Sequence, residues 1–124
     1  MSTKSVQGYR DLEVWQKSMD IAVCIYQLTR NFPKTENYGL CSQMQRAATS
    51  IPANIAEGRG RQHTKEFIHF LSIARGSLAE LETYVLLSTR LEYISNHQAD
   101  DLLPRTEEVN RMIVSLQRAL AKRI

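Results

Sequence analysis

The sequence has little cysteine, glycine and proline, and each shortage excludes a class of protein. The 124 residues include two cysteines, five glycines and three prolines. Cys24 and Cys41 are too far apart for a metal-binding C-x-x-C pattern, so we expect free thiols. The low glycine and proline content excludes collagen-like repeats, and 43% hydrophobic residues exclude a disordered chain. The length fits one domain with a real core.

Long apolar runs are also missing. Charged residues interrupt every apolar segment, so no stretch of 18 residues is available for a transmembrane helix. The sequence shows no N-terminal apolar stretch of the signal-peptide kind. We therefore expect a cytoplasmic protein without membrane contact.

The sequence lacks the alternation of apolar and polar residues that is typical of β-strands. Its apolar residues follow a helical period instead. Apolar residues recur every three or four positions in segments 11–32, 35–58, 64–91 and 102–120. We predict an all-α protein, an antiparallel up-and-down four-helix bundle over residues 10–124, with residues 1–9 as a flexible arm. Pro52 should kink the second helix, and Pro104 should lie in or just before the first turn of the fourth.

The first and third helices each carry two apolar stripes. In the first helix we assign the core stripe to Leu12, Trp15, Met19, Val23 and Tyr26. The second stripes have two interpretations, a wide arc that touches two neighbouring helices or a surface for self-association. We favour self-association, because large exposed apolar patches are uncommon on monomers. The predicted interface residues are Val14, Ile21, Ile25, Leu28, Ile73, Tyr84, Leu87 and Leu91.

Positive charge is modest overall but concentrated near the end of the chain. The sequence has 16 Lys and Arg against 13 Asp and Glu, a net charge of +3. A basic stripe on the last helix, repeated around a ring of subunits, would attract phosphate, whereas in a single subunit it could be a solvated face. The predicted nucleic-acid contacts are Arg46, Arg59, Arg61, Arg111, Arg118 and Lys122.

Candidate catalytic and metal sites are weak. Glu66 and His69 form an E-x-x-H pair, but a di-iron site in a helical bundle needs a second such pair and two more carboxylates. No phosphate-binding G-x-x-x-x-G-K loop occurs. We therefore expect no metal, no cofactor and no enzyme activity.

A line of polar residues borders the apolar stripe of the second helix. Polar groups at the edge of a core need hydrogen-bond partners, so we predict a structural network that fixes helix register around Pro52. Its predicted members are Gln43, Ser50, Asn54, Glu57 and Glu80.

Several strings of residues together resemble one known family. They are Leu12-Glu13-Val14-Trp15, Phe32-Pro33, Tyr38-Gly39-Leu40, residues 43–48, the Asn54-Ile55-Ala56-Glu57-Gly58 run and Gly76-Ser77-Leu78-Ala79-Glu80-Leu81-Glu82. The chain resembles the bacterial four-helix-bundle proteins encoded by intervening sequences in 23S ribosomal RNA genes. A related protein is the accessory subunit of diversity-generating retroelements, a basic pentameric barrel that binds nucleic acid and reverse transcriptase.

The resemblance implies a homopentamer with an RNA or DNA partner and no established enzyme activity. Together with the charge pattern, it favours a non-catalytic, homo-oligomeric bundle that binds structured nucleic acid, such as ribosomal RNA. The alternative is a protein-interaction scaffold or accessory subunit that does not contact nucleic acid, with reverse transcriptase or another protein as its partner.

Overall fold

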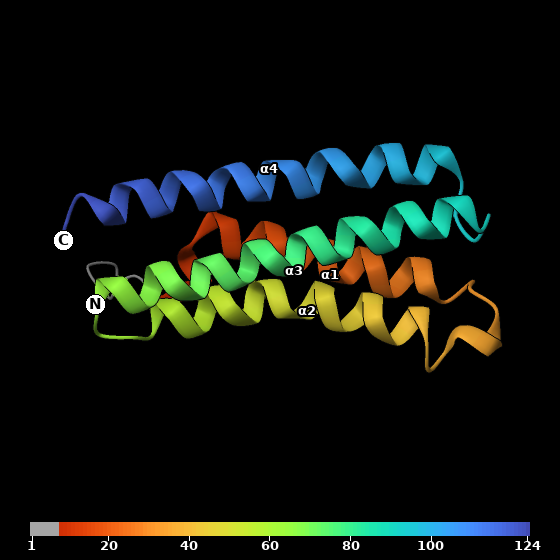
Figure 1. Cartoon of the computed structure of the whole chain (residues 1–124), viewed down its shortest axis with the longest axis horizontal. Helices are drawn as coiled ribbons and strands as arrows, with labels where there is room; N and C mark the ends of the chain where they lie inside the picture. Colours follow the sequence, from red (N-terminus) through yellow and green to blue (C-terminus); the bar gives the residue numbers. More distant parts are fainter. Residues whose placement is uncertain (1–7) are drawn as a thin grey trace.

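Four long helices make up most of the chain. The computed structural model describes residues 8–124, in which α1 spans Glu13–Thr29, α2 Leu40–Arg59, α3 Thr64–Arg90 and α4 Asn96–Ala121. Short 3-10 helices, η1 (Tyr9–Asp11) and η2 (Lys34–Glu36), precede α1 and α2. The described residues contain no strand, and the helices lie lengthwise side by side (Figure 1). The prediction of an all-α four-helix bundle is confirmed.

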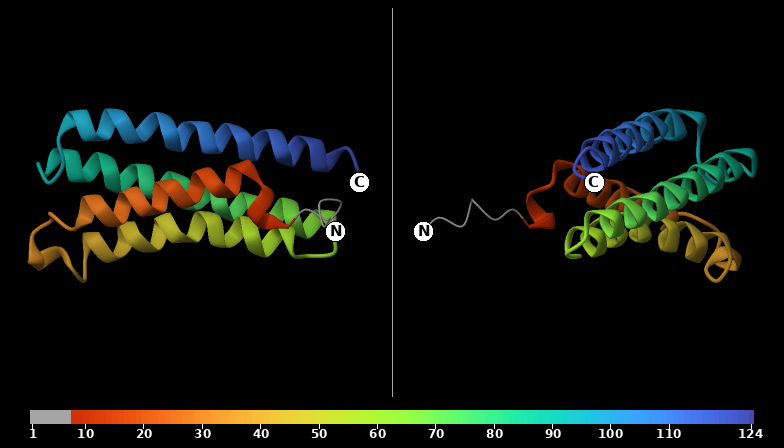
Figure 2. Two further views of the ribbon diagram at one scale, coloured as in Figure 1. Left: turned by 180° about the vertical axis from the view of Figure 1, so that it is seen from behind. Right: turned by 60° about the vertical axis from the view of Figure 1, so that its left-hand side comes forward.

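The helices surround one apolar core. α2 packs against α1 and α3, and α4 packs against α3 and α1, so α1 and α3 occupy opposite corners of the bundle (Figure 2). The apolar periodicity of α2 places Met44, Ile51 and Ile55 in this core without solvent exposure. Leu71 and Leu81 of α3 are buried in the same way.

The start of α4 differs from the prediction. Pro104 lies inside the helix, which begins at Asn96, because Ser95 and Gln98 form a capping box. The Ser95 hydroxyl accepts a bond from the Gln98 backbone N–H at 3.0 Å, and the Gln98 side chain accepts one from Ser95 N–H at 2.9 Å. These bonds satisfy donors that a helix start otherwise leaves unpaired, so the cap and not the proline sets the boundary.

The second helix continues through its proline. Pro52 is buried inside α2, which runs unbroken from Leu40 to Arg59, and the expected kink stays a prediction. Of the predicted flexible arm, residues 1–7 lie outside the described residues. Tyr9 belongs to η1, and its ring packs edge-on against Trp15 with centroids 5.2 Å apart.

The two apolar stripes of α1 are reversed relative to the prediction. Val14, Ile21 and Ile25, which we predicted to form an oligomer interface, are at most 5% exposed and belong to the core. Met19 and Val23, predicted as core, are 39% and 53% exposed. Both stripes have the same helical spacing, so periodicity could not decide which of them faces α2, α3 and α4. The interface prediction is wrong for these three residues.

Candidate functional site

The α2–α3 turn and the end of α4 lie at the same end of the bundle (Figure 1). Positive side chains of these two segments line a common cleft there. We call this end of the bundle the basic end. Arg59, Arg61 and Arg123 line a cleft there of about 350 Å³, and His63 lies beside them. The apolar wall of the cleft comes from Leu12, Phe67, Leu116 and Leu120. Arginine clusters of this kind suit the recognition of phosphate groups.

Arg61 is held in place by two neighbours. Its guanidinium forms an ion pair with Glu57 at 2.8 Å and lies 4.9 Å from the centroid of the Phe70 ring. The Arg61 side chain is still 42% exposed. Because a guanidinium has five N–H donors, the pair with Glu57 leaves donors that can reach an anion.

Close packing behind the cleft fixes the α2–α3 turn. A Cβ on Gly58 would come within 2.8 Å of Phe70 Cβ and 2.9 Å of Phe67 Cδ1, so α3 approaches α2 closely there. The N-cap of α3 is His63, whose side chain makes no capping hydrogen bond. The positive end of the α3 dipole therefore adds to the charge of the arginines.

Four of the six predicted nucleic-acid contacts belong to this end. Arg59 and Arg61 line the cleft, the exposed Arg118 lies in the last turn of α4, and the exposed Lys122 is the C-cap residue of α4, next to Arg123. The other two lie elsewhere, Arg111 in a separate cleft between α3 and α4 and Arg46 on the exposed surface of α2. Sequence reasoning missed Arg123 and His63 as site residues, although both adjoin residues that it selected.

Side-chain hydrogen bonds hold the opposite end of the bundle, which we call the hydrogen-bonded end. The Glu36 carboxylate accepts bonds from the Leu40 backbone N–H at 3.2 Å and from the Tyr93 hydroxyl at 2.9 Å. The hydrogen bond to Glu36 raises the pKa of Tyr93, and burial raises the pKa of Cys41. Phe32 packs against the Tyr93 ring with centroids 5.2 Å apart. These contacts join the segment between α1 and α2 to the segment between α3 and α4.

Glu92 ends α3 in a conformation that usually requires glycine. Its φ is 64°, in the left-handed region. Tyr93 N–H donates to Ser88 O at 2.9 Å, and Glu92 N–H donates to Thr89 O at 3.0 Å. This pair of bonds is the Schellman pattern, in which glycine normally takes the place of Glu92.

Part of the predicted polar network is present between α2 and α3. The hydroxyls of Ser50 and Ser77 are 2.8 Å apart, and the Asn54 amide donates to the Ser50 hydroxyl at 2.9 Å. Glu57 binds Arg61 instead. No hydrogen bond of the described side chains joins Gln43 or Glu80 to this network, and both residues are exposed. The network is therefore smaller than predicted.

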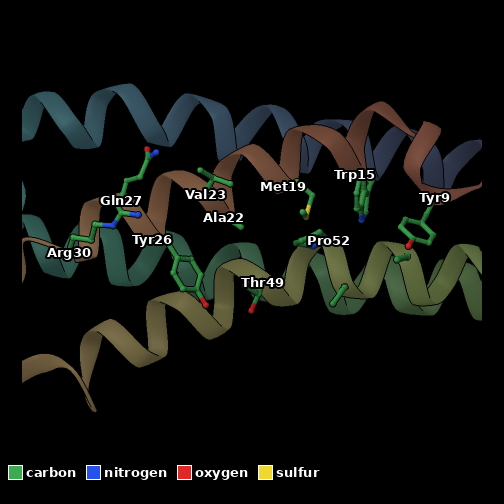
Figure 3. A pocket seen from close by; sticks show the side chains of 12 residues that line it. Tyr9, Trp15, Met19, Ala22, Val23, Tyr26, Gln27, Arg30, Thr49 and Pro52 are labelled. Carbon is green, nitrogen blue, oxygen red and sulfur yellow. The ribbon is translucent and has the colours of Figure 1, made fainter.

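An apolar groove of about 490 Å³ runs between α1 and α2. Figure 3 shows Trp15, Met19 and Tyr26 projecting from α1 toward α2, where Thr49 and Pro52 form the other wall. On the diagonally opposite helix, the predicted interface residues of α3 are accessible. Ile73, Leu87 and Leu91 are 39%, 43% and 45% exposed, and Tyr84 is half-buried, as is Leu28 of α1.

The candidate metal pair is not part of a larger cluster. Glu66 and His69 are exposed, and the His69 ring lies 5.7 Å from the Phe70 ring. Within residues 8–124, no three His, Cys, Asp or Glu side chains come close enough to hold a metal ion. None of the helices in this range combines the length and apolar character needed to cross a bilayer.

Fold and surface together define an all-α bundle with a basic end and two uncovered apolar faces. The chain belongs to the 23S rRNA-intervening sequence protein family, whose sequence pattern it matches over residues 10–115. It is similar to the crystal structure of a protein of unknown function from the S23 ribosomal protein family of Bacteroides thetaiotaomicron. The two are 32% identical with a TM-score of 0.76, and the match covers 84% of this chain and 97% of the other. No curated protein matches the chain.

Proposed function

We propose that this protein is a non-catalytic, homo-oligomeric bundle that binds structured nucleic acid, such as ribosomal RNA, through its basic end. The observation that carries the proposal is the convergence of Arg59, Arg61 and Arg123 on one cleft. Arg118 in the last turn of α4 and Lys122 at its C-cap add positive charge at the same end. Membership of a family named for 23S rRNA genes supports ribosomal RNA as the first target to test.

The composition of the cleft favours contact with the phosphate backbone over base recognition. Aromatic platforms for stacking bases are the usual feature of single-strand binders, and the aromatic residue in this cleft, Phe67, is half-buried. Arginine and lysine contacts to phosphate release counterions, so binding should weaken steeply as salt increases. Affinity should then depend on the fold of the RNA more than on its sequence.

Self-association would strengthen the weak positive electrostatic field that one chain produces. One chain carries a net charge of only +3, but several basic ends on one assembly present several phosphate sites to one RNA. We favour a pentameric ring, which the family resemblance implies. A ring would explain why a modest charge on each chain suffices for binding.

The test is a mobility-shift titration with a structured fragment of 23S ribosomal RNA. The variant R118Q/K122Q/R123Q removes three charges from exposed positions at the basic end. We expect its affinity to fall at least tenfold, and the slope of log affinity against log salt to become shallower by about two to three.

A matched variant, K34Q/R90Q/R105Q, removes the same charge away from the basic end and controls for a general electrostatic effect. It should bind within twofold of the wild type. Equal losses in both triple variants would contradict a localised site. Absence of salt-sensitive binding by the wild type to any RNA or DNA would overturn the proposal and favour a protein-interaction scaffold.

A further inference from the structure

The exposed large apolar side chains of residues 8–124 gather on two helices. Met19, Val23 and Tyr26 lie on α1, and Ile73, Leu86, Leu87 and Leu91 lie on α3; the others are Tyr38 and Ile124. α1 and α3 are at opposite corners of the bundle, since each packs against α2 and α4. One chain therefore presents two different apolar surfaces on helices at opposite corners of the bundle.

The two surfaces differ in shape and in charge. On the α1 side the surface is the groove of about 490 Å³, lined mostly by apolar side chains (Figure 3). Gln27 and Thr49 are polar lining residues, and Arg30 is the one charged residue of the lining. On α3 the surface is a line of apolar side chains at helical spacing, which we call the α3 ridge. It consists of Ile73, Tyr84, Leu87 and Leu91, and the charge in its line is Glu80.

We infer that the α3 ridge of one copy packs into the α1–α2 groove of the next copy. A groove with an apolar lining is covered best by projecting apolar side chains, and Arg30 and Glu80 have opposite charges. This inference rests on the self-association in the proposed function, and it adds which surfaces meet.

The pairing of unlike surfaces determines how the assembly grows. When a groove binds a ridge, each end of the resulting pair still has one free surface. Contacts of this head-to-tail kind continue until a ring closes, and they form an open filament if it does not. A symmetric dimer, in contrast, would bring the same surface of both copies together.

Two single substitutions separate the surfaces. V23E places a carboxylate in the groove, and L87E places one on the ridge; both positions are more than 40% exposed, so each chain should still fold. We expect the wild type to sediment as a multiple of the 14.2 kDa chain and each variant to sediment as a single chain. Y38E is the matched control, because Tyr38 is 99% exposed and outside both surfaces, and it should assemble like the wild type.

Mixing the two variants tests the head-to-tail pairing directly. V23E keeps its ridge and L87E keeps its groove, so an equimolar mixture at high micromolar concentration should form a complex of one chain of each and nothing larger. Circular dichroism of each variant verifies that the helices are intact.

Each outcome decides between the two proposals. Assembled wild type with assembled V23E and L87E would overturn the groove–ridge pairing and leave the proposed self-association intact. Single-chain variants that form no complex when mixed would also overturn the pairing. A wild type that sediments as a single chain would overturn both, whereas assembly without RNA binding would remove only the nucleic-acid function.

Discussion

The helix termini at the two ends of the bundle are stabilised in different ways. At the hydrogen-bonded end, Glu36 accepts two bonds, Ser95 caps α4, and the Schellman bonds close α3. At the basic end, the N-cap residue of α3, His63, makes no side-chain cap, and the packing of Gly58 against α3 holds the turn. One end places its polar side chains in hydrogen bonds that hold the helix termini, and the other gathers positive side chains around a cleft. The hydrogen bonds that cap the helices and the binding that we propose thus belong to opposite ends.

Gly58 should give the largest effect on stability, because the basic end depends on close packing. G58A adds a Cβ within 2.8 Å of Phe70 Cβ, so α2 and α3 must separate. We expect the free energy of unfolding in urea to fall by about 1–3 kcal/mol. In the matched variant G76A the new Cβ meets nothing within 4 Å, and stability should rise by about 0.5–1 kcal/mol. Equal effects of the two substitutions would show that the approach at Gly58 is not tight.

The helix starts at the two ends should respond with opposite signs. S95A removes the cap of α4 and should lower the free energy of unfolding by about 1 kcal/mol. H63S supplies the cap that α3 lacks and should raise the same free energy by up to about 1 kcal/mol. S95D keeps an acceptor at the cap and should resemble the wild type. A loss of stability in H63S would mean that the His63 side chain has a structural role of its own.

Glu92 tests the cost of the left-handed residue at the hydrogen-bonded end. E92G allows a φ of 64° without a Cβ, so we expect a gain of about 1 kcal/mol in thermal or urea unfolding. E92A removes the carboxylate and keeps the Cβ, and it should give no such gain. A similar gain in both variants would attribute the effect to charge.

Alkaline pH should weaken the hydrogen-bonded end slightly. The hydrogen bond to Glu36 raises the pKa of Tyr93 above 10.0, and burial raises the pKa of Cys41 above 9.0. Both groups hold their protons more tightly in the folded chain. Their contribution is therefore complete below these ordinary values and is lost as the pH rises through the higher pKa values of the folded state.

The variant Y93F should therefore flatten the decline of urea stability above pH 10.0. Y38F changes a tyrosine that is 99% exposed, and its decline should match that of the wild type. A decline in Y93F as steep as that of the wild type would assign the pH dependence to Cys41 or to other groups.

The periodicity of the sequence was sufficient to predict four helices, but not which faces are buried. In α2 the apolar stripe through Met44, Ile51 and Ile55 has no competitor, and all three residues are buried as expected. In α1 two stripes compete, and only the positions of the neighbouring helices decide that Ile21 and Ile25 turn inward. The start of α4 was readable from Ser95 and Gln98, a capping-box pattern that we overlooked in favour of Pro104.

The full set of residues in the candidate site could be recognised only from the three-dimensional structure. The local sequence places Arg59 and Arg61 in one turn, and both were predicted. Their meeting with Arg123 depends on α4 returning to the end of the bundle where α2 finishes, which no local pattern encodes. Arg111 shares a helical face with Arg118 but lines a different cleft, because a long helix spans much of the bundle.

An even number of antiparallel helices returns the chain to where it started, so Leu12 and Arg123 line the same cleft. A short flexible linker from residue 124 to residue 8 would therefore close the described part of the chain into a circle without crossing the bundle. The circle can then be opened at the exposed Tyr38, giving a circular permutant in the order α2, α3, α4, α1. Such a permutant would move both free ends to the hydrogen-bonded end, and a fluorescent or affinity tag placed there would leave the arginine cleft unobstructed.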